Sequence, residues 1–255
     1  MGAATSPGPD RGPPSARKHA SGVFISFEGG DGAGKSTQIA TLADALREAG
    51  RDVVVSREPG GAPGAEAIRK LLVEGPADRW SPMAEALLMY AARADHLQRT
   101  ILPALEAGAV VLTDRFADST MAYQGLAGAL GAATVERLHG LVVGTNDPDL
   151  TLILDLPPEE GLARAGARPG GGTESDGSGA GAESRFENKG AAYQGAVRAA
   201  FLKIAADNPD RCAVIDASGP AGEVAARIRA AVCARLPSLG PASPGLPPLG
   251  LPPSG

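Results

Sequence analysis

The chain has 255 residues, of which 43% are hydrophobic and 21% charged, as is typical of a globular protein with one sizeable core. Its formal net charge of −5 argues against a protein held to DNA or RNA mainly by phosphate contacts, because such a surface would usually be basic. No apolar run approaches the roughly 20 residues that span a membrane, and the N-terminus lacks the apolar stretch of a secretory signal. Cys212 and Cys233 have no metal-ligand spacing, so we expect reduced thiols in a cytoplasmic protein.

Both ends of the chain have compositions that are typical of disorder. Residues 1–21 are rich in Pro, Gly, Ala and Ser, and residues 237–255 contain Leu-Pro-Pro repeats. Their few apolar side chains could not offset the entropy lost on ordering, so we expect two disordered tails. The folded unit is therefore predicted to span 22–236.

Between the tails, short apolar runs alternate with helical patterns. In chain order the periodicity predicts a strand at 23–27, a helix at 38–48, a strand at 51–56, helices at 65–73 and 82–105, a strand at 110–113, helices at 118–125 and 134–143, a strand at 150–156, helices at 159–167 and 191–206, a strand at 213–216 and a helix at 223–234. Pro103 is a candidate break in the long helix, and the Gly/Ser run at 170–181 is expected to be a flexible loop. The alternation predicts an α/β fold with a mostly parallel five-stranded sheet sandwiched by helices.

A phosphate-binding motif follows the first predicted strand and precedes the first predicted helix. It fits G-x-x-x-x-G-K-[ST], with Gly29, Gly30, Asp31, Gly32, Ala33, Gly34, Lys35 and Ser36 followed by Thr37. Glycines let backbone N–H groups curl around phosphate oxygens, Lys35 would reach the β- and γ-phosphates, and the Ser36 hydroxyl would bind Mg²⁺. The motif predicts a nucleoside triphosphate site of the kind that GTPases, motor ATPases and small-molecule kinases share; the alternative is a chance Gly-rich turn.

Three charged positions beyond this motif suggest a second anion site. Asp114 follows the strand at 110–113, where an acid commonly organises Mg²⁺, although a turn-forming Asp would look the same. Arg57 also follows a strand and could clamp a phosphate or form an ion pair in a polar turn. Arg93 lies in an apolar helix, where an arginine more often snorkels to the surface. Together they favour a kinase with a phosphorylated acceptor; the N-K-G-A segment at 188–191 lacks the Asp of the GTPase motif N-K-x-D.

At this point the residues resemble the thymidylate kinase family over roughly 23–216. The segments that carry the resemblance are F-E-G-G-D-G-A-G-K-S-T at 27–37, R-E-P-G-G at 57–61, Y-A-A-R at 90–93, D-R-F at 114–116, S-T at 119–120, A-Y-Q-G at 122–125 and P-D-L at 148–150. The resemblance implies a P-loop NTPase-type domain over 22–236 with a mobile lid at about 164–190. It also implies ATP-dependent phosphorylation of dTMP to dTDP with Mg²⁺, in a homodimer. Another pyrimidine nucleoside monophosphate kinase, or a nucleotide-dependent switch or ATPase, is the alternative.

The resemblance also implies roles for individual residues. It implies that the dTMP phosphate is held by Arg57 and Arg115, and that the sugar is held by Asp31 and Tyr123. The thymine base would be contacted by Arg93, Thr120 and Gln124. For Mg²⁺ and its waters it implies Ser36, Asp114 and Glu28. The cations expected to act in catalysis are Lys35, Arg57, Arg115 and Arg185.

The sequence departs from the family pattern at two places. Met89 occupies the position of a Phe that usually stacks on thymine; methionine is polarizable and can pack on a ring. In addition, Gly32 stands where some members carry a mobile arginine directly after the P-loop acid. The catalytic cation is then expected from the lid, where Arg185 is the first candidate and Arg164 and Arg168 are the others.

Overall fold

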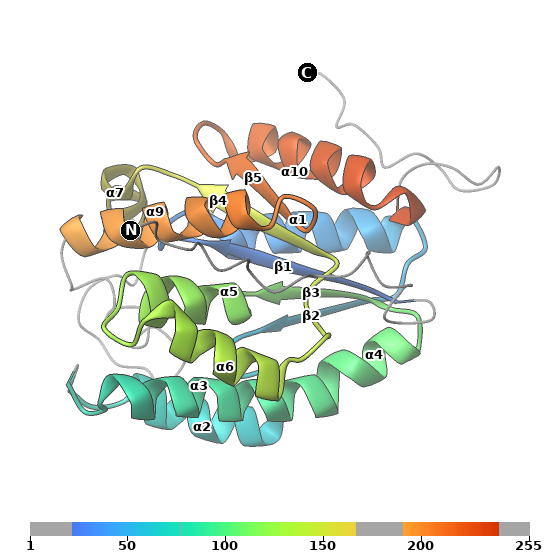
Figure 1. Ribbon diagram of the computed structural model, residues 1–255. Helices are drawn as coiled ribbons and strands as arrows, with labels where there is room; N and C mark the ends of the chain where they lie inside the picture. Colours follow the sequence, from blue (N-terminus) through green and yellow to red (C-terminus); the bar gives the residue numbers. More distant parts are fainter. Residues whose placement is uncertain (1–21, 77, 167–190, 240–255) are drawn as a thin grey trace, which may run out of the picture.

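The computed structural model describes residues 22–76, 78–166 and 191–239. Its centre is a parallel sheet of five strands in the order β2-β3-β1-β4-β5 (Figure 1). The strands are β1 (Val23–Gly29), β2 (Val53–Arg57), β3 (Val110–Asp114), β4 (Leu150–Asp155) and β5 (Cys212–Asp216). The predicted α/β class and all five strands are thus confirmed.

Helices cover both faces of the sheet because successive side chains of a buried strand point to opposite sides. In β1, Ile25 and Phe27 join the core beneath α1 (Lys35–Glu48) and α10 (Ala221–Arg235). Phe24 instead faces the layer formed by α3 (Pro82–His96), α4 (Leu102–Glu106) and α6 (Ala132–Val142). Further along this second face, Ile153 packs against α9 (Ala191–Asp207). The remaining helices are α2 (Pro63–Val73), which packs on α3, α5 (Ala117–Thr120) and α7 (Pro158–Gly166).

The long helix predicted at 82–105 does not break at Pro103. The chain passes from α3 through a π-helical turn, Leu97–Ile101, directly into α4. Pro103 is the second residue of α4 and comes directly after the π-helical turn. The helix predicted at 118–125 is likewise α5 followed by a second π-helical segment, Met121–Leu126. Wide turns of this kind often occur at functional sites.

The described structure continues past the expected boundary at 236. A 3₁₀ turn spans Pro237–Leu239, and Leu239 is buried against the core beneath α1 and α10. The backbone carbonyl of Ser238 also accepts a hydrogen bond from the Arg51 guanidinium at 2.6 Å. One leucine of the Pro-rich segment therefore belongs to the folded unit, because it completes an apolar surface that composition alone does not reveal.

The parallel strands end at one edge of the sheet and bring distant residues together there. Register pairs Phe27 with Asp114 and Arg57 with Asp114, while Gly29 is opposite Leu154. The connection after β1 therefore lies between those after β3 and β4. In open α/β sheets, ligands bind at this edge, where the order of the strands changes direction. Among the described residues, no helix is both long and apolar enough to cross a membrane.

Candidate active site

The P-loop forms a tight turn between β1 and α1. Gly29, Gly32 and Gly34 have positive φ values of 130°, 74° and 89°, which glycine adopts without strain. A Cβ on Gly32 would lie 2.0 Å from the carbonyl oxygen of Gly161 in α7. No side chain therefore fits at position 32 unless the backbone of α7 moves. This contact explains why the mobile arginine that some family members carry after the P-loop acid has no room in this chain.

The two residues that start α1, Lys35 and Ser36, both make polar contacts at the P-loop. Lys35 Nζ donates to the carbonyl oxygens of Gly29 (3.2 Å) and Gly30 (2.9 Å), so the ammonium group spans the mouth of the loop. The Ser36 hydroxyl donates to Asp114 Oδ2 at 2.9 Å. A hydroxyl and a carboxylate side by side at a phosphate cradle are hard oxygen ligands of the kind that Mg²⁺ prefers. The donor set thus fits the ion expected at Ser36 and Asp114.

The turn after β3 carries Arg115 into the site. Arg115 has φ of 69°, the one positive value found among the described residues other than glycine. Its guanidinium donates to Asp31 Oδ1, to the Gly29 carbonyl and to the Ser119 hydroxyl, and it lies 5.2 Å from the centre of the Tyr123 ring. Asp31 Oδ2 is buried and has no hydrogen-bond partner within the described part of the chain. The arrangement leaves a cation and a free carboxylate oxygen beside the P-loop.

Glu28 lies in the interior, at the end of β1, where it is hydrogen-bonded to the residues that follow β3. It is fully buried, and its two carboxylate oxygens accept hydrogen bonds from the Phe116 N–H (2.8 Å) and the Ser119 hydroxyl (2.6 Å). Burial, followed by the nearby charge of Asp118, raises the pKa of Glu28 to about 8. Its contacts fix the turn that presents Asp114 and Arg115.

Arg93 does not snorkel to the surface but is buried beneath the second face of the sheet. Its Nε donates to Glu58 at 2.8 Å, and its Nη2 donates to the Phe116 carbonyl and the Thr120 hydroxyl. The guanidinium also lies 4.7 Å from the centre of the Tyr90 ring. Arg93 Nη1 is buried without a hydrogen-bond partner among the described residues. Because a buried donor without a partner is costly, this nitrogen marks a place where a ligand acceptor would fit.

Glu58 and His96 support this arginine and were not anticipated as site residues. Glu58 Oε1 accepts from His96 Nδ1 at 3.0 Å, and His96 Nε2 is 2.7 Å from the Ser56 hydroxyl. A carboxylate can only accept, so the Nδ1 of His96 carries the proton in this contact. Glu58 belongs to the R-E-P-G-G segment, yet the segment does not reveal its partners, which lie 35 and 38 residues further along the chain.

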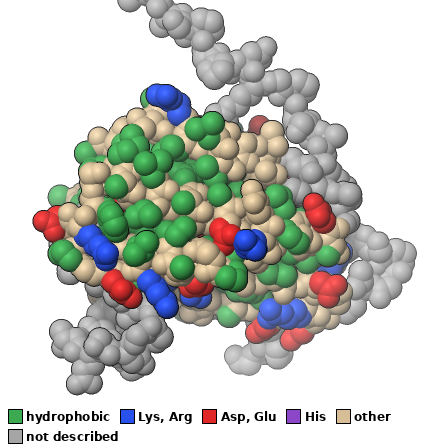
Figure 2. All heavy atoms as spheres, turned by 90° about the horizontal axis from the view of Figure 1, so that it is seen from below, with side chains coloured by type: hydrophobic (Ala, Val, Ile, Leu, Met, Phe, Trp, Pro, Cys, Tyr) green, Lys and Arg blue, Asp and Glu red, His purple; other side chains and the backbone are tan. Residues whose placement is uncertain are grey.

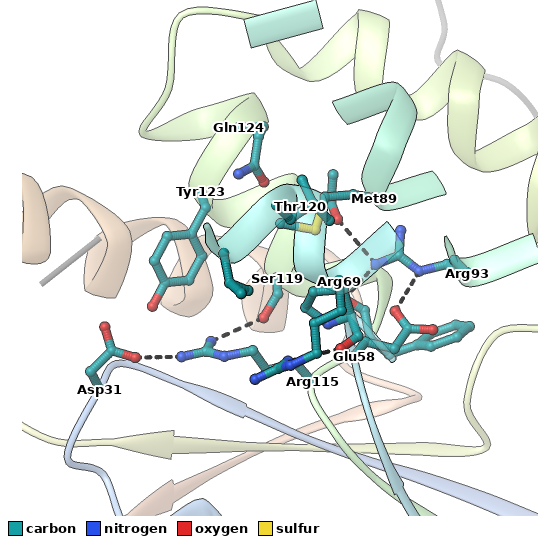
Figure 3. Close-up of a pocket in the computed structure, with 14 residues that line it drawn as sticks. Asp31, Glu58, Arg69, Met89, Arg93, Arg115, Ser119, Thr120, Tyr123 and Gln124 are labelled. Carbon is teal, nitrogen blue, oxygen red and sulfur yellow. Dashed lines mark hydrogen bonds and ion pairs between the residues drawn. The ribbon is translucent and has the colours of Figure 1, made fainter. Parts of the chain in front are cut away.

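A single pocket joins these groups (Figure 3). Asp31 and Arg115 lie at its P-loop end, Arg93 lies at its far end with Thr120 beside it, and Gln124 lies on the same wall on the side of Tyr123. The rest of its wall is formed by Glu58, Pro59, Arg69, Leu72, Val73, Met89, Phe116, Ser119 and Tyr123. Met89 therefore does line the pocket. Arg69, which donates to the Pro59 carbonyl at 2.8 Å, is another residue that the sequence did not single out.

Arg57 and the lid arginines stand apart from this pocket. Arg57 is 54% exposed and pairs with Glu66 at 3.1 Å on the neighbouring rim. An exposed ion pair contributes little stability, so Arg57 can exchange Glu66 for an anionic ligand at low cost.

Arg164 donates to the Ala217 carbonyl at 3.0 Å, which ties α7 to the loop after β5. Arg168 and Arg185, and with them most of the expected lid, lie outside the described residues.

The fold and the site define a P-loop kinase, with a phosphate cradle on one side and a pocket for a small acceptor on the other. The family model for thymidylate kinase matches residues 27–228. Thymidylate kinase of Caulobacter vibrioides is 58% identical over 215 residues, which are 84% of this chain and 98% of that protein. Thymidylate kinase of Dinoroseobacter shibae is 54% identical over 81% of this chain and 94% of that protein. The chain belongs to the thymidylate kinase family.

A solved structure agrees with this membership. The crystal structure of thymidylate kinase from Ehrlichia chaffeensis has a TM-score of 0.62 and 31% sequence identity to this chain. The likeness covers 83% of this chain and 99% of the other. The alternative of a nucleotide-dependent switch is therefore not favoured, and the chain is a phosphotransferase.

The buried carboxyl group of Glu28 leads to a prediction about stability. Its pKa is about 8 in the folded state and 4.5 ordinarily. At a pH between these two values the folded protein therefore binds one proton more than the unfolded chain. The free energy of unfolding should therefore fall as pH rises from about 4.5 to about 8 and level off above. Glu28→Gln should flatten this fall, because an amide resembles the protonated acid and does not titrate. Urea unfolding between pH 5 and 9 measures the slope.

The exposed Glu48→Gln in α1 is the matched control and should keep the slope of the parent chain. A Glu28→Gln variant with the same pH dependence as the parent would show that Glu28 is ionised in the folded protein.

Proposed function

We propose that the pocket between the P-loop and Arg93 is the dTMP site in which this chain carries out its reaction. The reaction is the transfer of a phosphoryl group from ATP to dTMP, which gives dTDP. The observation that carries the proposal is a pair of buried polar atoms at the two ends of one pocket, Asp31 Oδ2 and Arg93 Nη1, neither of which has a hydrogen-bond partner in the described parts of the chain. An acceptor oxygen faces the sugar end and a donor nitrogen faces the base end.

Each part of dTMP then has a partner of suitable chemistry. Arg115, together with Arg57 once it leaves Glu66, would hold the phosphate bidentately. Asp31 Oδ2 would accept from the 3′-hydroxyl, and Tyr123 would pack against the sugar. At the base end, Arg93 Nη1 would donate to O4 of thymine, with Thr120 and Gln124 beside it and Met89 packed on the ring.

The donor would bind on the other side of the P-loop, which runs from Gly29 to Thr37. Backbone N–H groups of the loop and Lys35 would hold the phosphates of ATP. Ser36 and Asp114 would hold Mg²⁺, which neutralises phosphate charge when bound. The dTMP phosphate has a second pKa of about 6 and is largely ionised at neutral pH, so the acceptor needs no strong general base. The main task of the side chains is to offset repulsion between two polyanions.

The base-reading role of Arg93 can be tested with Arg93→Lys. Lysine keeps a positive charge beside Glu58 but loses the planar fork and the unpartnered nitrogen. We expect the KM for dTMP to rise by about tenfold or more while the KM for ATP stays unchanged. Steady-state kinetics and a melting curve of the same preparation measure this. A dTMP KM within twofold of the parent in a folded variant would contradict the assignment.

We also propose that Arg185 supplies the catalytic cation of the lid. Gly32 leaves no space for an arginine on the P-loop, and Arg164 is held by the Ala217 carbonyl. Arg185→Ala should lower kcat by about 10²-fold or more with little change in the KM for dTMP, because the contact would form mainly in the transition state. Arg164→Ala and Arg168→Ala are the comparisons. If one of these abolishes turnover while Arg185→Ala is mild, the cation comes from the segment around α7.

A homodimer over the α2, α3 and α6 face completes the proposal. Hydrophobic side chains gather on the face seen from below, which these helices form (Figure 2). Its exposed members are Leu71, Met83, Leu87 and Leu141, with relative exposures of 41% to 83%. Contiguous apolar surface of this kind marks an interaction site.

Cys212 and Cys233 are both free thiols, which supports a reducing, cytoplasmic location.

The dimer can be tested by placing a charge in this face. Leu87→Glu should shift the protein from dimer to monomer in sedimentation velocity, because the carboxylate would lose its water on association. Val214→Glu places the same negative charge at another exposed apolar side chain, on the edge strand β5, and should leave the dimer intact. A monomeric parent chain, or a dimeric Leu87→Glu variant, would refute this interface.

A further inference from the structure

Gln124 is held at the base end of the pocket by a carboxylate that does not line the pocket. Its side-chain Nε2 donates to Glu85 Oε1 at 2.9 Å. Gln124 comes from the π-helical segment after α5 and is 6% exposed, whereas Glu85 lies in the first turn of α3. Two elements that are far apart in sequence therefore meet at this one hydrogen bond behind the pocket wall.

The chemistry of this contact fixes which way the Gln124 amide points. The two branches of a carboxamide have nearly the same shape, but one donates and the other accepts. A carboxylate oxygen only accepts, so the NH₂ branch must face Glu85 and the carbonyl branch must face away from it. In Figure 3 the carbonyl oxygen of Gln124 lies on the side of Thr120 and Met89, and its nitrogen points away from them.

Gln124 and Arg93 then present a defined pattern to a bound base. Arg93 Nη1 is a donor without a partner among the described residues, and the Gln124 carbonyl is an acceptor on the same pocket wall. Thymine and uracil carry the complementary pair, the O4 acceptor and the N3–H donor. Cytosine carries the opposite pair, a 4-amino donor and an N3 acceptor. The pattern fits the first two bases and opposes the third.

We propose that Glu85 is a specificity-determining positioning residue, which orients the Gln124 amide so that the pocket accepts a base that donates at N3. The inference rests on the proposed placement of dTMP in this pocket. Glu85 acts through Gln124 and does not touch the substrate. Without Glu85, the amide can turn by 180° and offer its NH₂ group to N3 of cytosine, so the rejection of cytosine would then rest on Arg93 alone.

The test compares dTMP, dUMP and dCMP as acceptors for Glu85→Gln and Glu85→Leu. A Gln at 85 can pair with either orientation of Gln124, and a Leu pairs with neither. In both variants we expect the ratio of kcat/KM for dTMP to that for dCMP to fall by about tenfold or more. The ratio for dTMP to dUMP should stay within twofold, because these bases share the same O4 and N3–H edge. A general loosening of the pocket would not separate the two ratios in this way.

Two further variants make the outcome decisive. Glu106→Gln, the same replacement on an exposed residue at the end of α4, should leave both ratios unchanged. Gln124→Leu should raise the KM for dTMP if the base binds beside Gln124. If Gln124→Leu has no effect, the proposed dTMP site is wrong. If Gln124→Leu impairs dTMP binding but both Glu85 variants keep the dTMP to dCMP ratio of the parent, the site holds and the role of Glu85 is refuted.

Discussion

The hydrogen bonds that Glu28 accepts from the residues after β3 are the contacts on which the rest of the site depends. This turn contains Arg115 in a left-handed backbone conformation, which is unfavourable for a side chain of its size. Glu28 holds it by accepting from the Phe116 N–H and the Ser119 hydroxyl. The same turn places Asp114 against Ser36, Arg115 against Asp31 and the Phe116 carbonyl against Arg93. One buried carboxyl group thereby supports both the P-loop end and the Arg93 end of the pocket.

A second carboxylate organises the Arg93 end of the pocket in a similar way. Glu58 accepts hydrogen bonds from Arg93 and His96, one on each carboxylate oxygen. His96 is in turn hydrogen-bonded to the Ser56 hydroxyl. Burying charged groups is costly unless they are paired and hydrogen-bonded, and these are. The arrangement leaves Arg93 with a single nitrogen for a ligand and little freedom to move. A donor fixed in this way loses less entropy on binding than a flexible side chain would.

Preorganisation of this kind suits a reaction in which the protein supplies charge and position more than proton transfer. Lys35 and Arg115 already lie at the mouth of the P-loop through contacts with backbone carbonyls. Cations that are held in place before the substrates arrive need no rearrangement as charge develops in the transition state. Arg57 is half exposed and pairs with Glu66 on the rim, so it is held less firmly than these two cations.

The sequence by itself determined the succession of strands and helices along the chain and the position of the P-loop, and it indicated a second anion site beside that loop. These follow from local periodicity and from short motifs whose members are neighbours in the chain. Only the tertiary structure decided which groups pair across the core. The Glu58–Arg93, Glu58–His96 and Glu85–Gln124 contacts join residues 35 to 39 positions apart, and no pattern in the sequence encodes their meeting. It also decided that Glu28 supports a turn and that Leu239 belongs to the core. Burial depends on what surrounds a side chain in space, and composition along the chain does not record that.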